Sequence, residues 1–251
     1  MKRFSALLLA LVMLFSLCGC TRRDAVLSES WTYAAEGEIT SLNIRIGAAD
    51  FRLRAGDAFA VESNLKYLSV SEQGGTLVLD EDTKPNRNYK DAFLYLTVPR
   101  GAQLDRVDIK TGAAEISVDA LDCKTLDMKL GAGDVSFAYL AVSAEADIEG
   151  GAGKITVSDG SIRDLDLEMG VGELDLTVAL LGDCDLEFGV GESKIALLGD
   201  KDRYCIEIDK GIGPVFVDGV KVTDFGTSGS GENHIEISGG LGEIRLTLEE
   251  E

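Results

Sequence analysis

The segment LEMGVGELDL, residues 167–176, places a Gly-x-Gly pair between two runs in which apolar and acidic side chains alternate. Alternation with a period of two is typical of a strand that buries one face. A dinucleotide-binding loop needs a third glycine and a following helix, but a second alternating run follows Gly172 here, and the chain has no GxxxxGK motif. The glycine pair is therefore interpreted as a bend in the backbone, and no nucleotide is expected to bind.

The same unit recurs along the chain as RIGAADFRL, KTGAAEISV, KLGAGDVSF, EGGAGKITV, EMGVGELDL, EFGVGESKI, DKGIGPVFV and SGGLGEIRL. In the last seven units, the first glycines are separated by 19, 20, 19, 19, 22 and 29 residues. The longest interval contains TDFGTSGSGENH, residues 223–234, which is interpreted as an inserted loop. The glycines assigned to structural corners are Gly47, Gly112, Gly131, Gly133, Gly151, Gly153, Gly170, Gly172, Gly189, Gly191, Gly211, Gly213, Gly240 and Gly242.

This near-constant interval predicts an all-β fold, a single-stranded β-helix or β-solenoid with about 19 to 22 residues per coil. Successive coils would stack about 4.8 Å apart, so their lengths must stay in step. Glycine suits the corners because it lacks a Cβ and takes positive φ. In the alternative, an antiparallel β-meander or sandwich, each glycine pair is a hairpin turn. Trp31 and Tyr33 are expected to cap the first coil.

The N-terminal sequence MKRFSALLLALVMLFSLCGC has two basic residues before an apolar run, as an export signal does. Its last residues, LCGC, resemble the lipobox of bacterial lipoproteins, which implies cleavage before Cys20 and lipid attachment to its sulfur. The mature protein is thus expected on the extracytoplasmic face of the cell membrane, held by its lipid anchor. The predicted organisation is a lipoprotein signal peptide at 1–19, the lipidated cysteine and a tether at 20–38, and a β-solenoid at 39–248, with irregular coils at 39–110 and regular coils at 111–248.

The mature chain is strongly acidic, with 22 basic and 44 acidic residues after removal of 1–19 and hence a net charge of −22. Nucleic acid is not an expected partner, because binding it requires basic residues. An acid directly follows the corner in six units, at Asp50, Glu115, Asp134, Glu173, Glu192 and Glu243. Other acids alternate outward before the corner, at Asp166, Glu168, Asp185, Glu187, Glu207 and Asp209.

Stacked carboxylates one strand apart repel by about 0.9 kcal/mol per pair at the dielectric constant of water. One interpretation is a solvated face that limits aggregation. The other is Ca²⁺ binding along an acidic ladder that includes Asp134, Glu173 and Glu192, because Ca²⁺ accepts several carboxylate oxygens. No other metal or cofactor is expected.

Residues suited to catalysis are scarce. The single histidine, His234, lies in a Gly/Ser-rich loop, and Ser228 and Ser230 lack the nucleophile-elbow motif. The alternation places Cys184 inward and Cys205 outward. Whether a disulfide joins them is left open. No catalytic residue is assigned.

The segments LNIRIGAADFRL and LTVPRGAQLDRVDIKTGAAEISV, with the GAGDV-type units that follow, resemble the putative-adhesin β-strand-repeat family of unknown function. The resemblance covers about residues 39–248 and implies a β-helix-like fold, an extracytoplasmic setting and an adhesive or envelope-stress role. The favoured function is a non-enzymatic, surface-anchored lipoprotein whose adhesin-like β-solenoid binds an envelope protein or glycan, or supports envelope-stress signalling. The alternative is a carbohydrate-active β-helix enzyme, a polysaccharide lyase or hydrolase.

Overall fold

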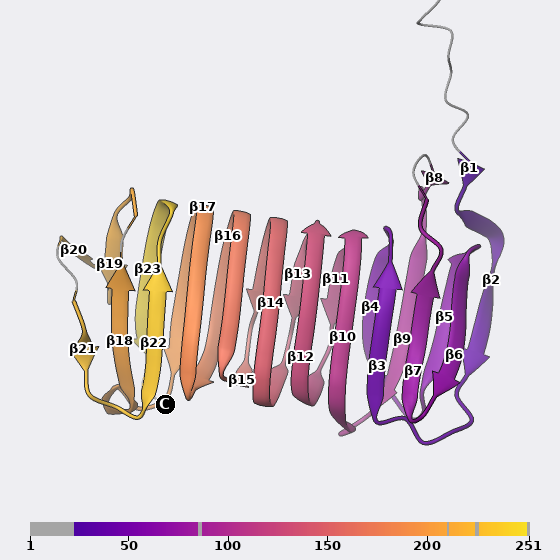
Figure 1. Cartoon of the computed structure of the whole chain (residues 1–251), viewed down its shortest axis with the longest axis horizontal. Helices are drawn as coiled ribbons and strands as arrows, with labels where there is room; N and C mark the ends of the chain where they lie inside the picture. Colours follow the sequence, from indigo (N-terminus) through magenta and orange to yellow (C-terminus); the bar gives the residue numbers. More distant parts are fainter. Residues whose placement is uncertain (1–22, 85–86, 210, 224–225, 250–251) are drawn as a thin grey trace, which may run out of the picture.

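The computed structural model describes residues 23–84, 87–209, 211–223 and 226–249. The predicted signal peptide and Cys20 lie outside these residues. The described chain is all-β, as predicted: one long mixed sheet winds around an apolar core, and β1 and β8 form a separate short pair (Figure 1). None of the described residues forms a helix that is long and apolar enough to cross a membrane.

The central strands are β10 (Gln103–Ala113), β11 (Glu115–Val118), β12 (Leu121–Ala132), β13 (Val135–Phe137), β14 (Leu140–Val157), β15 (Gly160–Arg163), β16 (Leu165–Leu181) and β17 (Asp183–Leu198). Before them lie β1 (Arg23–Asp24), β2 (Val26–Ala34), β3 (Ser41–Ile46), β4 (Asp50–Gly56), β5 (Ala60–Leu65), β6 (Leu68–Gln73), β7 (Thr76–Glu81), β8 (Arg87–Asn88) and β9 (Phe93–Pro99). After them come a 3-10 turn (Lys201–Arg203), β18 (Tyr204–Asp209), β19 (Val215–Val217), β20 (Val220–Val222), β21 (Ser228–Gly229), β22 (Asn233–Ser238) and β23 (Leu241–Glu249).

The central strands pair in parallel. Strand β12 lies between β10 and β14, and β16 lies between β14 and β17. Leu167, for example, is paired with Ile148 on one side and Leu186 on the other, each 19 residues away. Parallel partners at this offset mean that the chain returns beside itself after each repeat. The antiparallel meander is therefore wrong for this region.

The two ends of the sheet depart from the simple repeat. Strand β3 lies between β7 and β10, although β7 follows it in the chain, and β22 lies between β17 and β18. The units at both ends therefore do not stack in chain order. The 29-residue interval before the last unit supplies the length of chain that brings β22 back to β17. Short antiparallel strands then cover the outer strands: β21 on β18, β20 on β19, β6 on β7, and β2 on β5.

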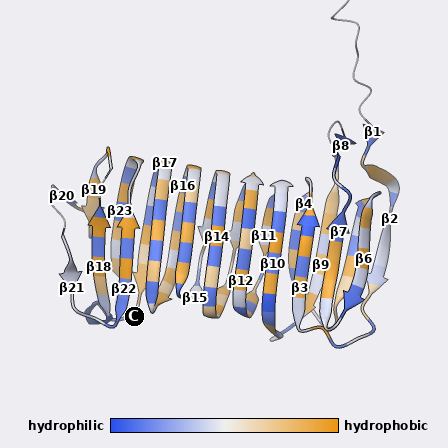
Figure 2. Cartoon of the chain, in the orientation of Figure 1, coloured by the Kyte–Doolittle hydropathy of each residue, from blue (hydrophilic) through white to orange (hydrophobic). Residues whose placement is uncertain are grey.

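The apolar core runs along the whole sheet, and Figure 2 shows hydrophobic and hydrophilic residues alternating along the strands. Within residues 126–246, this alternation in the sequence predicts which apolar side chains point inward. Three predicted interior residues, Leu130, Phe188 and Val217, are only half-buried. Leu130 and Phe188 lie next to the open corner, and Val217 lies on β19, whose outer neighbour is the short strand β20. The buried ones are Leu126, Met128, Val135, Phe137, Ile148, Ile155, Val157, Leu165, Leu167, Met169, Leu174, Leu176, Leu186, Ile195, Leu197, Ile206, Ile208, Val215, Ile244 and Leu246.

The segment predicted to be a tether, 20–38, differs from that expectation, because β1 and β2 lie within it. Strand β2 pairs with β5, and its aromatic side chains pack against the core. Trp31 Nε1 donates a hydrogen bond to the carbonyl of Leu65 (3.3 Å), and Tyr33 Oη donates one to the Glu72 carboxylate (2.7 Å). Both aromatic residues thus belong to the N-terminal cap, and the chain folds from β1 onward.

The corners allow neighbouring backbones to approach closely. A Cβ on Gly131 would lie 2.2 Å from the carbonyl oxygen of Gly112. At Gly172, where φ is +150°, a Cβ would lie 1.7 Å from the carbonyl oxygen of Gly153. Backbone atoms cannot yield to a side chain there, so the stacking itself requires glycine.

We expect Gly172→Ala to lower the free energy of unfolding by about 3 kcal/mol or more, because it combines backbone strain with a clash against backbone. Gly74, with φ +56° and open space around it, isolates the strain, and Gly74→Ala should cost about 1–2 kcal/mol. Gly226→Ala, also in open space and without positive φ, should be nearly neutral. Urea unfolding measures all three. Equal losses for Gly172→Ala and Gly74→Ala would contradict the close stacking.

Leu167→Asp should lower the free energy of unfolding by about 4 kcal/mol or more, since it removes a buried apolar side chain and buries a carboxylate between two coils. The adjacent exposed substitution Glu168→Gln is the control and should change stability by less than about 0.5 kcal/mol. Urea unfolding followed by circular dichroism provides the comparison. An unchanged midpoint for Leu167→Asp would refute an inward position for this side chain.

Candidate binding surface

Parallel stacking turns one position of the repeat into a column of side chains. The residue four positions before the first corner glycine is acidic in seven units, and pairing places these acids on neighbouring strands. We call this the acidic column; in spatial order it comprises Asp108, Asp127, Asp147, Asp166, Asp185, Glu236 and Glu207. Sequence analysis identified three of the seven and missed Asp108, Asp127, Asp147 and Glu236. Their constant offset from the glycine was the signal that would have found them.

A second column lies two positions before the glycine and changes sign along the sheet. Paired neighbours in it are, in order, Arg45, Lys110, Lys129, Glu149, Glu168, Glu187 and Ser238. At the change of sign, Lys129 forms an ion pair with Glu149, and this hydrogen bond raises the pKa of the Lys129 ammonium. Glu168 and Glu187 have no ion-pair partner within the described part of the chain.

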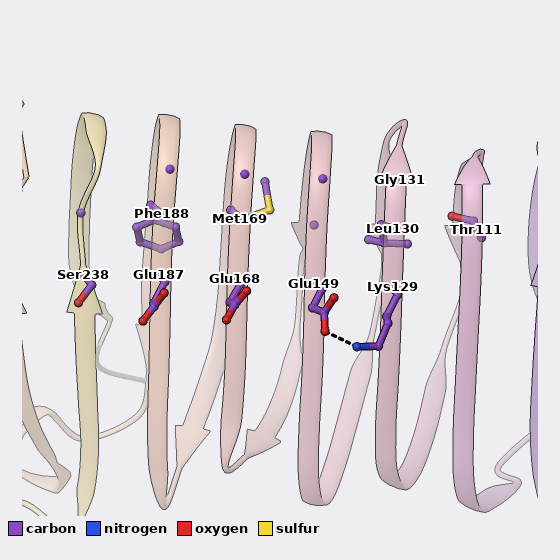
Figure 3. Close-up of a pocket in the computed structure, with 15 residues that line it drawn as sticks. Thr111, Lys129, Leu130, Gly131, Glu149, Glu168, Met169, Glu187, Phe188 and Ser238 are labelled. Atoms are coloured by element: carbon purple, nitrogen blue, oxygen red, sulfur yellow. Dashed lines mark hydrogen bonds and ion pairs between the residues drawn. The ribbon is translucent and has the colours of Figure 1, made fainter.

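These carboxylates form one wall of an open groove of about 760 Å³ beside the corner. Figure 3 shows Glu149, Glu168 and Glu187 side by side, with Met169 and Phe188 nearer the corner. Half-buried Leu130 and Phe188, together with Met169 and the first corner glycines, supply the apolar lining. We call this hollow the corner groove. It combines unpaired negative charge with an apolar floor, which suits a cationic ligand that also carries apolar groups.

The predicted calcium ladder is interrupted. Lys154 lies between Asp134 and Glu173: its backbone N–H donates to Asp134 Oδ1 (3.0 Å), and its Nζ lies 3.5 Å from Glu173 Oε2. Of Asp134, Glu173 and Glu192, only the last two are paired neighbours, and Lys194 Nζ lies 3.6 Å from Glu192 Oε2. Among the described residues, no three acidic, histidine or cysteine side chains are grouped so as to hold a metal ion. Calcium binding therefore stays a prediction from the sequence.

The two cysteines of interest are free and face opposite ways. Cys184 is buried, and burial raises the pKa of its thiol. Cys205 is half-buried. Its neighbour on the adjacent strand is His234, and the neighbour of His234 on the strand beyond is Asp183. These three border a second hollow of about 500 Å³ that is lined mainly by acids. His234 makes no hydrogen bond through its ring within the described residues, so the hollow shows no activated nucleophile.

Negative charge is concentrated in one half of the elongated molecule. Residues 131–251 contain 8 basic and 26 acidic residues, a net charge of −18, whereas residues 20–130 contain 14 and 18, a net charge of −4. At the boundary, burial raises the pKa of Asp147, and the nearby carboxylates of Asp127, Glu149 and Asp166 raise it further. Repulsion from neighbouring carboxylates therefore adds to the effect of burial at Asp147.

Asp147→Asn should raise the melting temperature at pH 7, by about 2 °C. A carboxyl whose folded-state pKa is raised destabilises the fold once it ionises, so its cost is present at pH 7 and is lost as the pH falls toward its ordinary value near 4. The gain should therefore shrink at pH 4. Asp159→Asn, at an exposed site outside the acidic column, is the matched control. A gain of equal size at both pH values would contradict the repulsion at Asp147.

Solved structures similar to this chain include the following three. A protein from Parabacteroides distasonis ATCC 8503, described as a putative lipid binding protein, is 14% identical, with 89% of this chain and 99% of that chain covered and a TM-score of 0.44. A putative adhesin from Parabacteroides merdae ATCC 43184 is 11% identical (87% and 95% covered, TM-score 0.41). A putative adhesin from Bacteroides fragilis NCTC 9343 is 16% identical (88% and 98% covered, TM-score 0.40).

No curated protein matches the chain. A family profile, described as Toastrack DUF4097, matches residues 39–247, which is nearly the whole range over which the sequence resembles an adhesin-like repeat family. The resemblance seen in the sequence is thus confirmed, and the chain belongs to the Toastrack DUF4097 family.

Proposed function

We propose that this protein is a non-catalytic, lipid-anchored binding protein of the cell envelope, whose corner groove binds an envelope component that carries cationic groups. In this proposal Cys20 is the lipidated residue and the body, on the extracytoplasmic face, is a β-solenoid of about 19 to 22 residues per coil. One observation carries the proposal: Glu149, Glu168 and Glu187 line the same groove on neighbouring strands, and the last two have no cation partner among the described residues.

The spacing of the groove explains why a cation would bind. Neighbouring strands lie about 4.8 Å apart, so three carboxylates follow one another over about 10 Å. Each adjacent pair repels, and the repulsion grows as a partner displaces water. A ligand with several positive charges converts this repulsion into attraction, and its apolar parts can contact Met169 and Phe188.

The arrangement of possible catalytic residues favours binding over turnover. Ser228 and Ser230 are exposed at the edge of the sheet, and neither they nor Cys205 is hydrogen-bonded to His234 within the described chain. A nucleophilic mechanism requires such a nucleophile and base pair. The acids are abundant, but they form continuous columns rather than a pair set apart in one cleft. No observation favours the glycan-cleaving alternative.

The mature protein should bind poly-L-lysine, and binding should weaken steeply as salt is raised from about 10 mM to about 1 M, because the attraction is ionic. The triple substitution Glu149→Gln, Glu168→Gln, Glu187→Gln should weaken binding about tenfold, which corresponds to about 1.4 kcal/mol. Isothermal titration calorimetry measures the affinity.

The matched control removes the same charge elsewhere, through Glu29→Gln, Glu38→Gln and Glu115→Gln at exposed positions outside the groove. Equal weakening by both triple variants would mean that binding depends on the overall negative charge and not on the groove, and would overturn the proposed site. Incubation with envelope glycans should give no cleavage products. Turnover that the groove substitutions abolish would favour the enzyme instead.

A further inference from the structure

The outer edge of the corner carries an exposed apolar stripe. Val171, Val190, Leu241 and Ile212 lie between corner glycines and are 55%, 47%, 49% and 76% exposed, respectively. Val171 is paired with Val190, Val190 with Leu241, and Leu241 forms a bridge with Ile212. The four side chains therefore follow one another across neighbouring coils. We call this stripe the apolar ridge.

Bulky residues are not needed for this bend. The same corner position holds Ala113, Ala132 and Ala152 in the preceding coils, and Ala152 is paired directly with Val171. Alanine therefore fits the same geometry, with less apolar surface exposed to water. A contiguous exposed apolar patch on a soluble surface is typical of an interaction site. The larger side chains occur only in the C-terminal coils, where the chain is most acidic.

Acids flank the apolar ridge on both sides. Glu168, Glu187 and Asp209 precede the ridge residue of their own coils by three positions, and Glu173, Glu192 and Glu243 follow theirs by two. The three acids that follow the ridge residues form ion pairs with Lys154, Lys194 and Arg245, respectively. Those on the corner-groove side include Glu168 and Glu187, which have no ion pair among the described residues. The surface is thus apolar along its centre, with its unpaired negative charge on the groove side.

This pattern selects its partner by charge. A second copy of the same chain would bring two acidic halves together, and an anionic membrane would be repelled as well. The complement is an apolar stripe bordered by cations, as on a cationic amphipathic α-helix. Its turns repeat every 5.4 Å, close to the strand spacing of about 4.8 Å, so apolar residues one turn apart can contact successive ridge side chains.

We propose that the apolar ridge and the acids beside it form a docking site for a cationic amphipathic α-helix of a polypeptide partner. This inference rests on the proposed function, because Glu168 and Glu187 belong to the corner groove as well. It adds the class of partner: a helical segment whose apolar face covers the ridge while its lysine or arginine side chains reach the carboxylates.

The test compares two peptides of roughly 18 residues, about 27 Å as helices, made of the same leucines and lysines. One has an amphipathic helical order and the other a scrambled order. The mature protein should bind the amphipathic peptide at least about tenfold more tightly. The ridge variant Val171→Ser, Val190→Ser, Ile212→Ser, Leu241→Ser should lose that preference and still bind poly-L-lysine. The control Ala113→Ser, Ala132→Ser, Ala152→Ser, at the same corner position, should keep it.

Equal affinity for both peptides, or a preference that survives in the ridge variant, would overturn the inference while poly-L-lysine binding still supports the corner groove. Failure to bind poly-L-lysine would instead overturn the proposed function. Ridge-dependent binding to phosphatidylcholine vesicles without any peptide preference would assign the ridge to the membrane and also overturn the inference. If the ridge variant melts at a lower temperature, Ile212→Ser alone, at the most exposed position, should still reduce the preference.

Discussion

The structure depends on one constraint: backbones of neighbouring coils lie a single hydrogen-bond spacing apart, corners included. At Gly172 there is no room for even a Cβ beside the carbonyl of Gly153. A shift of one residue in a strand would also exchange its buried and exposed faces. Coil length must therefore stay nearly constant. Where the interval is 20 residues rather than 19, the pairing of β12 with β14 absorbs the extra residue as an irregularity between Cys123 and Thr125.

The same register makes the surface as repetitive as the core. An outward side chain at one position of the repeat lies beside its counterparts on the neighbouring coils. Charged residues at that position therefore form a continuous row. At Asp147, burial raises the pKa of the carboxyl and the neighbouring carboxylates raise it further, so repulsion acts at this position of the acidic column. The second column changes sign between Lys129 and Glu149. Beyond that point a few lysines and arginines form ion pairs with acids, but none of those in the described chain reaches Glu168 or Glu187. Neighbouring coils thus present negative charge together at the same position of the repeat.

Much of the fold could be predicted from the sequence, because both the glycine spacing and the alternation are local signals. They gave the all-β fold, the inward residues and the outward facing of Cys205. The order of the end coils could not be predicted, because a repeat looks the same whichever neighbour it has. The 29-residue interval marks an insertion, but it does not indicate that β22 lies between β17 and β18. Strand β2 was missed because it alternates weakly. Four members of the acidic column were missed because the acids before the corner were followed in three units only, although all seven share one offset from the glycine.

The positions of the groove and ridge follow from those inserted ends. Strands β14, β16 and β17, which carry Glu149, Glu168 and Glu187, have partners on both sides, and β23, which carries Leu241, lies between β17 and β19. Only Ile212 belongs to the outermost coil. Side chains held by two neighbours lose little freedom when a partner binds, so less of the binding energy is spent on ordering them. The fold thus places the unpaired carboxylates and most of the ridge on strands that have partners on both sides, while short antiparallel strands occupy the ends.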